Sequence, residues 1–443
     1  MLEKFFKLRA NGTTVGTEVV GGATTFMTLS YIVFVQPIVL SGAGMDQGAV
    51  MVATCVSSAI ACLLMAFLAN YPIALAPAMG HNFYFAVVVA TRLNGDWQTA
   101  LGAVMISGAL FVLLSIFGVR ARLISIVPDS LRHAIAVGIG LLIALYGLQS
   151  SGILVNTGGR VGPPTGIGNL SEPAVLLAVF GLAAVGVLMA LRIKGAILIS
   201  ILLAAVAGLF MGIFEYEGTV SVPPSVAPTL FRFDIVGAFK LGLLDVIFVF
   251  FFLDLFDTIG TLIAVGEQGG FMKPEGLPRA RQALLSDAIG TVAGAALGTS
   301  TVTSYVESAS GIAQGARTGL ASVVTAALML LALFFSPLVK MVSAGHEVGG
   351  VMIYPAIGPA LVVVGAIIMS SCLKIAWRDM TEALPCFLTI TVIGFTMQIT
   401  EGIAFGFITY SFLKLITGRG KKVHWLLYLL SVLFILRFVF LQG

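Results

Sequence analysis

The most informative stretch of this chain reads Phe251-Phe252-Leu253-Asp254-Leu255-Phe256-Asp257-Thr258-Ile259-Gly260-Thr261. It places two carboxylates, three residues apart, in a run of side chains that otherwise favour lipid. An ionised aspartate near the middle of a bilayer costs roughly 2.5–3.5 kcal/mol even on lenient insertion scales. Such acids therefore face a protein-lined cavity, and they mark a functional site by default.

The composition of the whole chain is that of a membrane protein. Of its 443 residues, 58% are hydrophobic and 10% are charged, whereas soluble domains carry about 25% charged residues. No stretch is long and polar enough to form a soluble domain. The four cysteines lie in or beside apolar runs without zinc or disulfide spacing. The sequence therefore predicts no metal, no cofactor and no nucleic-acid partner.

Fourteen apolar runs divide the chain, and a further hydrophobic stretch follows at 423–441. Lys4, Lys7 and Arg9 precede the first run. Most other Lys and Arg fall in loops that an alternating arrangement places on the same side of the membrane, as the positive-inside rule requires. We expect a multi-pass protein of the inner membrane with a cytoplasmic N-terminus, and a last stretch that lies in the membrane interface.

Two runs at matching positions are interrupted. With fourteen spans, the second seven enter the membrane from the opposite side, which is the parity of an inverted repeat. The third run, Ile73–Phe85, contains Pro77 and Gly80, and the tenth, Leu297–Gly311, begins with β-branched and hydroxyl residues. Broken spans in corresponding positions indicate the binding site of a transporter, at which the N–H groups of half-helix N-termini point at the ligand.

Three segments occur in order along the chain: Asn70-Tyr-Pro-Ile-Ala-Leu-Ala-Pro77, Asp254-Leu-Phe-Asp257-Thr-Ile-Gly-Thr261 and Gly298-Thr-Ser-Thr-Val-Thr-Ser-Tyr-Val-Glu307-Ser. Together they resemble the nucleobase–cation symporter-2 (nucleobase/ascorbate transporter) family, within it the purine permeases of the adenine/guanine/hypoxanthine group. The resemblance extends from Phe5 to about residue 417.

This resemblance implies an all-α polytopic fold of fourteen spans as two inverted seven-span repeats, with short strands in the broken spans 3 and 10. It also implies a homodimer that imports nucleobases with protons. The implied division is a core domain of 1–120 (spans 1–4) and 236–345 (spans 8–11), a gate domain of 121–235 (spans 5–7) and 346–420 (spans 12–14), and a C-terminal hydrophobic helix at 421–443.

The family's binding residues can be placed on this chain. Its acidic substrate ligand in the eighth span falls on Asp257, with Asp254 one turn earlier, and its acidic ligand in the tenth span falls on Glu307. The resemblance further places Asn82, the aromatic Phe83 and the backbone around Tyr305 beside the base. The purine permeases usually read Pro-Gly-Met-Gly-Leu-Asn-Ala in the third span, whereas this chain has Ala78, His81 and Phe83 there, so the preferred base stays open.

Each of these residues also has a purely structural interpretation. A buried acid can hydrogen-bond backbone N–H groups, and Asn82 can cap the half-helix that follows it. Asp254 either orients a neighbouring element or shares a proton with Asp257, and Asp287 is expected to bond between helices. His81 is either a satisfied structural histidine or a second ligand or proton relay. Candidates for proton coupling are Asp257, Glu307 and His81.

The sequence thus predicts a secondary active transporter, and not an enzyme, that imports adenine, guanine or hypoxanthine by proton symport. A carboxylate accepts two N–H bonds from the edge of a purine, and charge-assisted hydrogen bonds contribute about 1.5–3 kcal/mol. One alternative is a uracil, xanthine or urate carrier of the same fold. Another is an anion transporter of related architecture, although the acidic site and the absence of a nearby cation in the sequence argue against it.

Overall fold

The computed structural model describes residues 2–117, 127–156, 164–216, 218–240, 244–273, 277–349 and 351–440. The chain forms two compact units: Met1–Gly118 with Phe180–His346, and Val119–Val179 with Glu347–Gly443. All seven residues predicted to form the site belong to the first unit.

The described residues form a helical fold in which eight helical segments are long and apolar enough to cross a membrane. These segments are Val15–Ser41, Gln47–Ala69, Trp97–Ile116, Asp129–Ser150, Pro173–Ala190, Leu244–Gly266, Gly319–Val342 and Ile399–Ile416. The shorter apolar helices are Ala196–Phe210, Gly358–Lys374, Met380–Thr396 and Trp425–Leu436. The helical membrane-protein fold expected from the composition is therefore present, whereas fourteen spans and an inverted repeat stay predictions.

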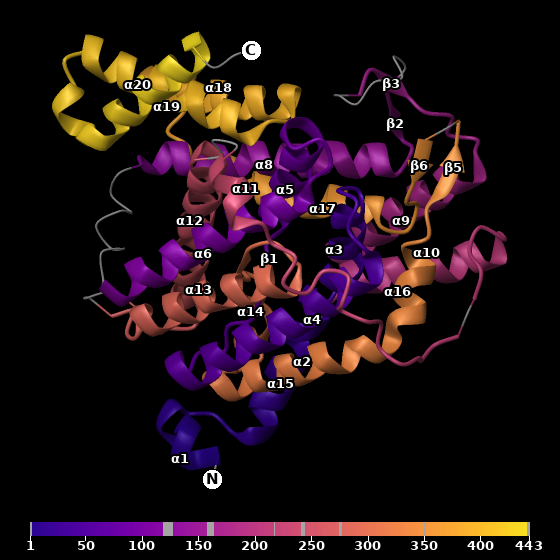
Figure 1. The fold of residues 1–443 in the computed structure, drawn as a ribbon. Helices are drawn as coiled ribbons and strands as arrows, with labels where there is room; N and C mark the ends of the chain where they lie inside the picture. Colours follow the sequence, from indigo (N-terminus) through magenta and orange to yellow (C-terminus); the bar gives the residue numbers. More distant parts are fainter. Residues whose placement is uncertain are drawn as a thin grey trace. The chain divides into compact units, whose positions relative to one another are not determined.

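The first unit consists mainly of helices, which are labelled in Figure 1. Up to its strand β1, its elements are α1 (Leu2–Phe6), α2 (Val15–Leu29), α3 (Ile32–Ser41), α4 (Gln47–Leu64) and a π-helical turn at Met65–Ala69. After β1 (Leu75–Pro77) come α5 (Met79–Arg92), α6 (Trp97–Phe117), α10 (Ala196–Phe210), α11 (Ile235–Lys240), α12 (Leu244–Gln268) and α13 (Ala280–Leu297). After β4 (Val302–Ser304) come α14 (Ser308–Ala313), α15 (Gly319–Ala332) and α16 (Ser336–Val342), and α9 (Pro173–Ala190) runs from the second unit into the first.

Side-chain caps and glycines set the ends and the close packing of these helices. Asp46 starts α4 by accepting a hydrogen bond from the N–H of Ala49 over 2.7 Å, the usual role of an N-cap carboxylate. Gly298 ends α13 with a left-handed φ of 101°. Helix α15 packs against α2 and α4, and Gly22 on α2 lies so close to Ala321 that a side chain there would meet its carbonyl. Small residues allow such close approach of membrane helices.

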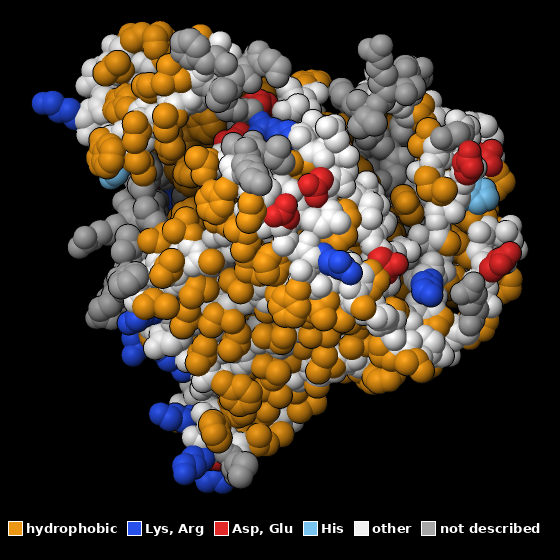
Figure 2. All heavy atoms as spheres, in the orientation of Figure 1, with side chains coloured by type: hydrophobic (Ala, Val, Ile, Leu, Met, Phe, Trp, Pro, Cys, Tyr) orange, Lys and Arg blue, Asp and Glu red, His pale blue; other side chains and the backbone are white. Residues whose placement is uncertain are grey.

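The outer face of the first unit is apolar. Figure 2 shows hydrophobic side chains over the region where α2 and α15 lie in Figure 1, and Lys and Arg at the end formed by α1. Exposed apolar side chains on these helices include Val20 and Leu331. A surface of this kind is suited to contact with lipid and its charged interface.

The two interrupted segments pair with each other as strands. β1 and β4 are antiparallel, with Leu75 opposite Ser304, Ala76 opposite Thr303 and Pro77 opposite Val302. Helix α5 starts after β1, and α14 starts shortly after β4. The short strands predicted in the third and tenth runs, each followed by a helix, are therefore confirmed.

Neighbouring groups satisfy the backbone around this strand pair. The N–H of Ala78 donates to the carbonyl of Thr301, and the N–H of Tyr305 donates to the carbonyl of Ala74, both over 2.9 Å. The hydroxyl of Ser308 accepts from the N–H of Ala74 over 2.9 Å. Irregular backbone at membrane depth is tolerated only where protein or a cavity satisfies its polar groups, so this local network makes the strand pair possible.

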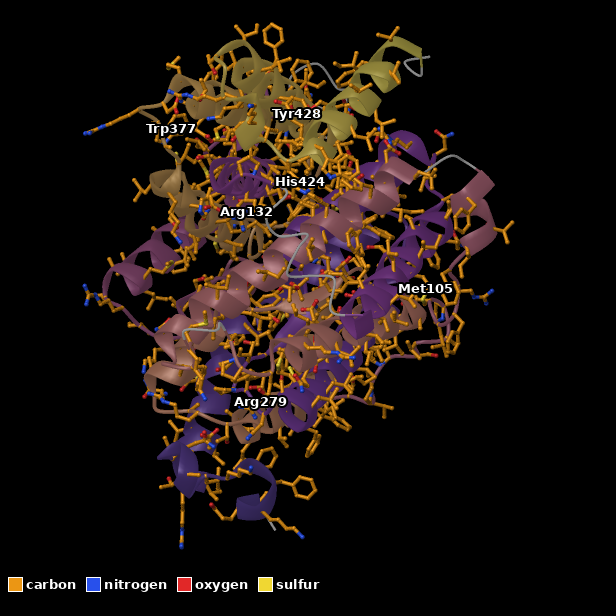
Figure 3. All side chains as sticks on the ribbon, turned by 90° about the vertical axis from the view of Figure 1, so that its left-hand side faces the viewer. Met105, Arg132, Arg279, Trp377, His424 and Tyr428 are labelled. Atoms are coloured by element: carbon orange, nitrogen blue, oxygen red, sulfur yellow. The ribbon has the colours of Figure 1, made fainter. Side chains whose placement is uncertain are left out.

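The loop before α13 is held by an aromatic contact. The guanidinium of Arg279, labelled in Figure 3, lies 4.8 Å from the centre of the Tyr71 ring. The hydroxyl of Tyr71 also donates to the carbonyl of Pro278. The segment that leads into β1 is thereby attached to the start of α13.

The second unit is built on close helix pairs. Its helices are α8 (Asp129–Ser150), α17 (Gly358–Met369), α18 (Met380–Thr396), α19 (Ile399–Ile416) and α20 (Trp425–Phe440). Strand β2 (Leu154–Val155) pairs with β3 (Gly166–Ile167), and β5 (His346–Val348) pairs with β6 (Val351–Ile353). Helix α8 packs against α17 and α18, and α20 packs against α19. Within the stretch predicted as a hydrophobic helix at 421–443, α20 begins at Trp425 and ends at Phe440, and residues 441–443 lie outside the described part.

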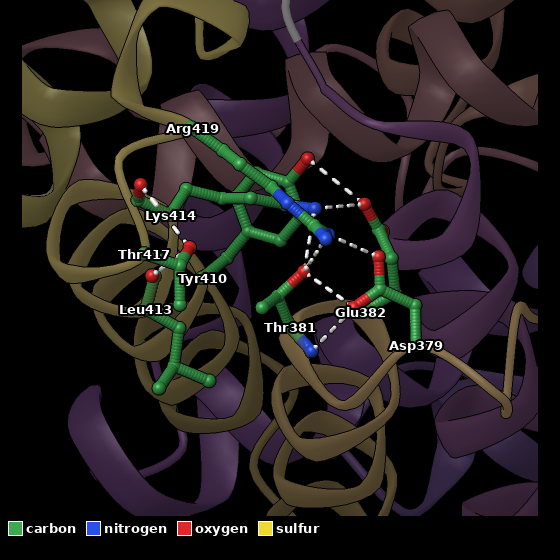
Figure 4. A network of polar contacts seen from close by, with 8 residues as sticks. All are labelled: Asp379, Thr381, Glu382, Tyr410, Leu413, Lys414, Thr417 and Arg419. Carbon is green, nitrogen blue, oxygen red and sulfur yellow. Dashed lines mark hydrogen bonds and ion pairs between the residues drawn. The ribbon is translucent and has the colours of Figure 1, made fainter.

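A polar network joins α18 and α19 in this unit (Figure 4). The ammonium of Lys414 lies 2.7 Å from Glu382 Oε1 and also donates to the hydroxyl of Thr381 over 2.7 Å. Arg419 pairs with Asp379 over 2.7 Å. Because each charge has an opposite partner, the ends of the two helices are held together without an isolated buried ion.

Candidate functional site

Asp257 presents its carboxylate from α12 beside strand β4. Its side chain is exposed, whereas the neighbouring residues Leu255 and Thr258 are buried. The hydroxyl of Thr303, on β4, donates to Asp257 Oδ2 over 3.3 Å. Asp257 is therefore oriented by the strand while remaining accessible to a ligand.

Glu307 presents a second carboxylate, immediately before α14. Its side chain is partly buried, and the hydroxyl of Tyr31 donates to Oε1 over 2.9 Å. The backbone carbonyl of Glu307 accepts hydrogen bonds from Ser310 over 2.7 Å and from Thr28 over 3.4 Å. The junction of α2 and α3 thus fixes the segment that carries this acid.

The two carboxylates and two phenols belong to one electrostatic cluster. Asp257 and Glu307 are close enough to interact through their charges, and both interact with Tyr31 and Tyr305. The hydroxyl of Tyr305 donates to the backbone carbonyl of Pro77, which connects the cluster to β1. The structure therefore brings Asp257 of α12 together with Tyr305 and Glu307, which lie far along the chain between β4 and α14.

Asn82 lies at the centre of a buried amide network. Its Nδ2 donates to Gln36 Oε1, and its Oδ1 accepts from the hydroxyl of Ser300. Gln36 in turn donates to the hydroxyl of Thr299 over 2.8 Å. All four side chains are fully buried, so Asn82 ties α5 to α3 and to the approach of β4.

The aromatic residues and the histidine of α5 are buried beside this network. Phe83 is 3% exposed and His81 is 2% exposed. Neither ring nitrogen of His81 has a hydrogen-bond partner among the described residues. The ring of Tyr84 packs edge-on against Phe250 of α12, with centroids 4.8 Å apart. Tyr84 thus connects α5 to α12.

Asp254 and Asp287 meet through one hydroxyl. The side chain of Thr258 lies 2.8 Å from Asp287 Oδ2 and 3.4 Å from Asp254 Oδ1. Asp287 Oδ1 also accepts from the backbone N–H of Ser304 over 3.0 Å. The expectation that Asp287 bonds between elements is confirmed, because it joins α13 to α12 and β4.

Two residues of the cluster were not predicted from the sequence. Tyr31 and Gln36 lie in the first apolar run, where Tyr31 follows Ser30 and Gln36 stands between Val35 and Pro37. A phenol and an amide in such a run are the features of the sequence that could have indicated a site. Their partners could not be identified in this way because they lie far along the chain. No group of His, Cys, Asp and Glu suited to a metal ion occurs in the described ranges.

This arrangement suits a flat ligand with N–H donors on its edge. The carboxylates of Asp257 and Glu307 supply acceptors, and the hydroxyl groups of Thr303 and Tyr31 orient them. Helix α5 carries aromatic side chains. Binding sites for small molecules combine apolar walls with a few placed polar groups in this way. Discrimination is sharp where buried polar groups would be left unpaired by the wrong ligand.

The chain is similar to known permeases over its whole length. A family model described as the permease family matches residues 16–405. A putative permease of Methanocaldococcus jannaschii is 50% identical, over 100% of this chain and 99% of that protein. The adenine permease AdeP of Escherichia coli is 44% identical over 100% of this chain and 97% of its own length. The guanine/hypoxanthine permease PbuG of Bacillus subtilis is 43% identical over 100% of both.

Solved transporters share the fold. The transmembrane domain of the cyanobacterial bicarbonate transporter BicA matches with a TM-score of 0.62 at 15% identity, over 88% of this chain and 96% of that one. The structure of SLC26A9 matches with a TM-score of 0.62 at 12% identity, over 91% of this chain and 65% of that one. At these identities the likeness concerns the fold alone.

Proposed function

The chain belongs to the nucleobase/ascorbate transporter family, and on that basis we propose that it imports a purine nucleobase together with a proton. The relatives are permeases and not enzymes. Adenine, guanine and hypoxanthine are the candidate substrates, since these bases appear in the names of full-length relatives.

The observation that carries this proposal is the pair of acids beside the paired strands β1 and β4. Asp257 is held by Thr303 and Glu307 by Tyr31, so both carboxylates are oriented before a ligand arrives. Oriented acceptors reduce the ordering that binding requires, and this increases affinity. In the proposed complex Asp257 and Glu307 accept N–H bonds from the base.

The other predicted residues have supporting roles in the proposed complex. Asn82 positions the start of α5 through its bonds to Gln36 and Ser300, and Phe83 contributes the aromatic wall. The backbone around Tyr305 borders the base, Asp254 supports Asp257 from one turn away, and His81 supplies a second polar contact.

The coupled proton is proposed to bind at a titratable side chain of the site, with Asp257, Glu307 and His81 as the candidates. A proton on Asp257 or Glu307 offsets one negative charge of the site. Moving an uncompensated charge through the bilayer is costly. The protein that carries both the base and the proton therefore changes between its inward-open and outward-open states more readily.

The proposed transport cycle follows the predicted architecture. In this cycle the protein has fourteen spans arranged as two inverted repeats. A core domain of residues 1–120 and 236–345 moves against a gate domain of residues 121–235 and 346–420. The functional form is proposed to be a homodimer in the inner membrane, with the N-terminus in the cytoplasm. Alternating access by relative movement of two such halves is the common mechanism of inverted-repeat transporters.

Uptake of radiolabelled bases tests the function. Cells that lack their own purine carriers and express this chain are expected to accumulate adenine, guanine or hypoxanthine, and a protonophore is expected to abolish the accumulation. Uracil, xanthine and urate serve as competitors, and preferential competition by one of them would redirect the substrate assignment. Bicarbonate or sulfate uptake in place of base uptake would overturn it.

Substitutions test the site separately. Asp257→Asn and Glu307→Gln are each expected to abolish uptake while the protein reaches the membrane. Thr303→Val, which removes the donor to Asp257, is expected to reduce uptake. Thr301→Val is the matched control, because the Thr301 hydroxyl is buried and has no hydrogen-bond partner in the described part of the chain. Full uptake by both Asp257→Asn and Glu307→Gln would refute the assignment.

A further inference from the structure

Asp287 contacts the residues next to both members of the Asp257–Thr303 pair. Thr258, which donates to Asp287 Oδ2 over 2.8 Å, directly follows Asp257. Ser304, whose backbone N–H donates to Asp287 Oδ1 over 3.0 Å, directly follows Thr303. The hydroxyl of Ser304 lies 3.4 Å from the same oxygen. The Asp287 carboxylate on α13 therefore connects α12 and β4 through the residues that directly follow Asp257 and Thr303.

The alternation of side chains along β4 explains why Thr303 reaches Asp257. Helix α13 holds the strand at Val302 as well, because the Thr291 hydroxyl donates to the Val302 carbonyl over 2.9 Å and lies 3.2 Å from its N–H. The residues on both sides of Thr303 are thus fixed to α13. The side chains of Val302 and Ser304 also face α13, because a Cβ at Gly294 would meet the Val302 side chain and the Ser304 hydroxyl lies 3.4 Å from Asp287 Oδ1. Successive strand side chains point to opposite faces, so the Thr303 hydroxyl is directed away from α13 toward Asp257.

The burial of the two acids divides their roles. Asp287 is fully buried, whereas the Asp257 side chain is exposed. A ligand can therefore reach Asp257 while Asp287 accepts only from protein groups such as Thr258 and Ser304. A buried donor that loses its acceptor is costly, so the bonds from Thr258 and Ser304 make Asp287 an effective anchor for both elements.

We propose that Asp287 is a positioning residue for substrate binding: it fixes the spacing of α12 and β4 so that Thr303 orients the Asp257 carboxylate toward the base. This proposal rests on the proposed function, because Asp257 is taken as the substrate ligand. A site held within about 0.5 Å of its productive geometry by surrounding hydrogen bonds binds more tightly than a loose one.

Binding of a purine to purified full-length protein tests the proposal. The probes are adenine and hypoxanthine, measured by isothermal titration. Asp287→Asn keeps the shape but replaces one acceptor oxygen with an amide donor. Because a binding group that is displaced by a fraction of an ångström binds less well, the expected loss of purine affinity is about tenfold. Of the bonds to Asp287, Thr258→Val removes only the one from Thr258, so it is expected to give a smaller loss of affinity. This variant takes the place of Asp287→Asn if that protein does not fold.

Glu18→Gln is the matched control. Glu18 is also a fully buried carboxylate that accepts backbone N–H bonds, but its partners are Arg317, Thr318 and Ala321. A general loss of stability would affect both variants, whereas loss of positioning affects purine affinity in Asp287→Asn alone. Unchanged affinity in folded Asp287→Asn and Thr258→Val would overturn the proposal, as would an equal loss in Glu18→Gln.

Hydrogen exchange separates this proposal from the proposed function. In Asp287→Asn and Thr258→Val, amide exchange in the segment 299–306 is expected to accelerate, while Glu18→Gln leaves it unchanged. If the wild-type protein binds no purine, the proposed function fails, and the exchange rates then decide whether Asp287 fixes the strand. Unaltered exchange in both variants would overturn the positioning role.

Discussion

The hydroxyl of Tyr31 donates a hydrogen bond to Glu307 Oε1 over 2.9 Å, between residues 276 positions apart. Tyr31 is buried between α2 and α3, so the phenol has little freedom to move. This contact orients one acid of the candidate site from the first apolar run of the chain.

Removing this phenol hydroxyl is expected to weaken substrate binding. Tyr31→Phe keeps the ring but removes the donor, and the lost bond to a charged group corresponds to about a tenfold or greater loss of purine affinity. Isothermal titration with adenine or hypoxanthine measures it. Tyr428→Phe is the control, because Tyr428 donates to the carbonyl of Gly420 in the second unit. Equal affinities for Tyr31→Phe and wild type would contradict the expectation.

Glu18 is expected to stabilise the first unit without affecting the site. Its carboxylate accepts from the N–H groups of Arg317, Thr318 and Ala321 at the start of α15. Glu18→Ala leaves buried donors without their acceptor, at about 1–3 kcal/mol for each group. Thermal unfolding of the purified protein is expected to shift to lower temperature, while the folded fraction keeps its purine affinity. An unchanged unfolding temperature would argue against this cap.

Close helix packing in the second unit is expected to exclude a side chain at Gly147. A Cβ there would lie 2.7 Å from the backbone nitrogen of Val362 and 2.8 Å from the carbonyl oxygen of Gly358. Because backbone atoms cannot swing aside, Gly147→Ala is expected to destabilise the protein by about 1–3 kcal/mol.

Gly186 provides the comparison for this substitution. It lies within α9, and a Cβ there would meet nothing within 4 Å. Gly186→Ala is therefore expected to stabilise the helix by roughly 0.5–1 kcal/mol. Thermal unfolding of the two variants distinguishes packing from helix propensity, and a similar shift in both would contradict the packing argument.

Asp379 is expected to make the stability of the second unit depend on acidity. The hydroxyl and the backbone N–H of Thr381 donate to its carboxylate, and Arg419 pairs with it, which lowers its pKa from 3.8 to about 2. A carboxylate with a lowered pKa stabilises the folded state above its unfolded pKa, and this contribution disappears as the pH falls toward about 2.

The measurement is the unfolding temperature of wild type and Asp379→Asn as a function of pH. Wild type is expected to be more stable at pH values above about 4, and the difference is expected to shrink on acidification below that value. A difference that stays constant through this range would show that the Asp379 charge does not contribute.

The positions of the broken spans could be predicted from the sequence because their causes are local. Pro77 and the hydroxyl-rich residues 299–304 disfavour a continuous helix, and the structure has β1 and β4 there. The acids of α12 were recognisable for a similar reason, since the cost of a charge in lipid does not depend on the rest of the fold.

The tertiary structure decided which groups meet at those positions. Three contacts depend on packing between helices that are far apart in the chain. These are the bond of Asn82 to Gln36, the bond of Tyr31 to Glu307, and the bridge that Asp287 forms between Thr258 and Ser304. Hydropathy records that a segment is buried but not which neighbour it faces. The sequence by itself therefore determined the membrane fold class and the segments that carry the acids, whereas the partners and orientation of each acid came from the packing of α2, α3, α5 and α13 around the two strands.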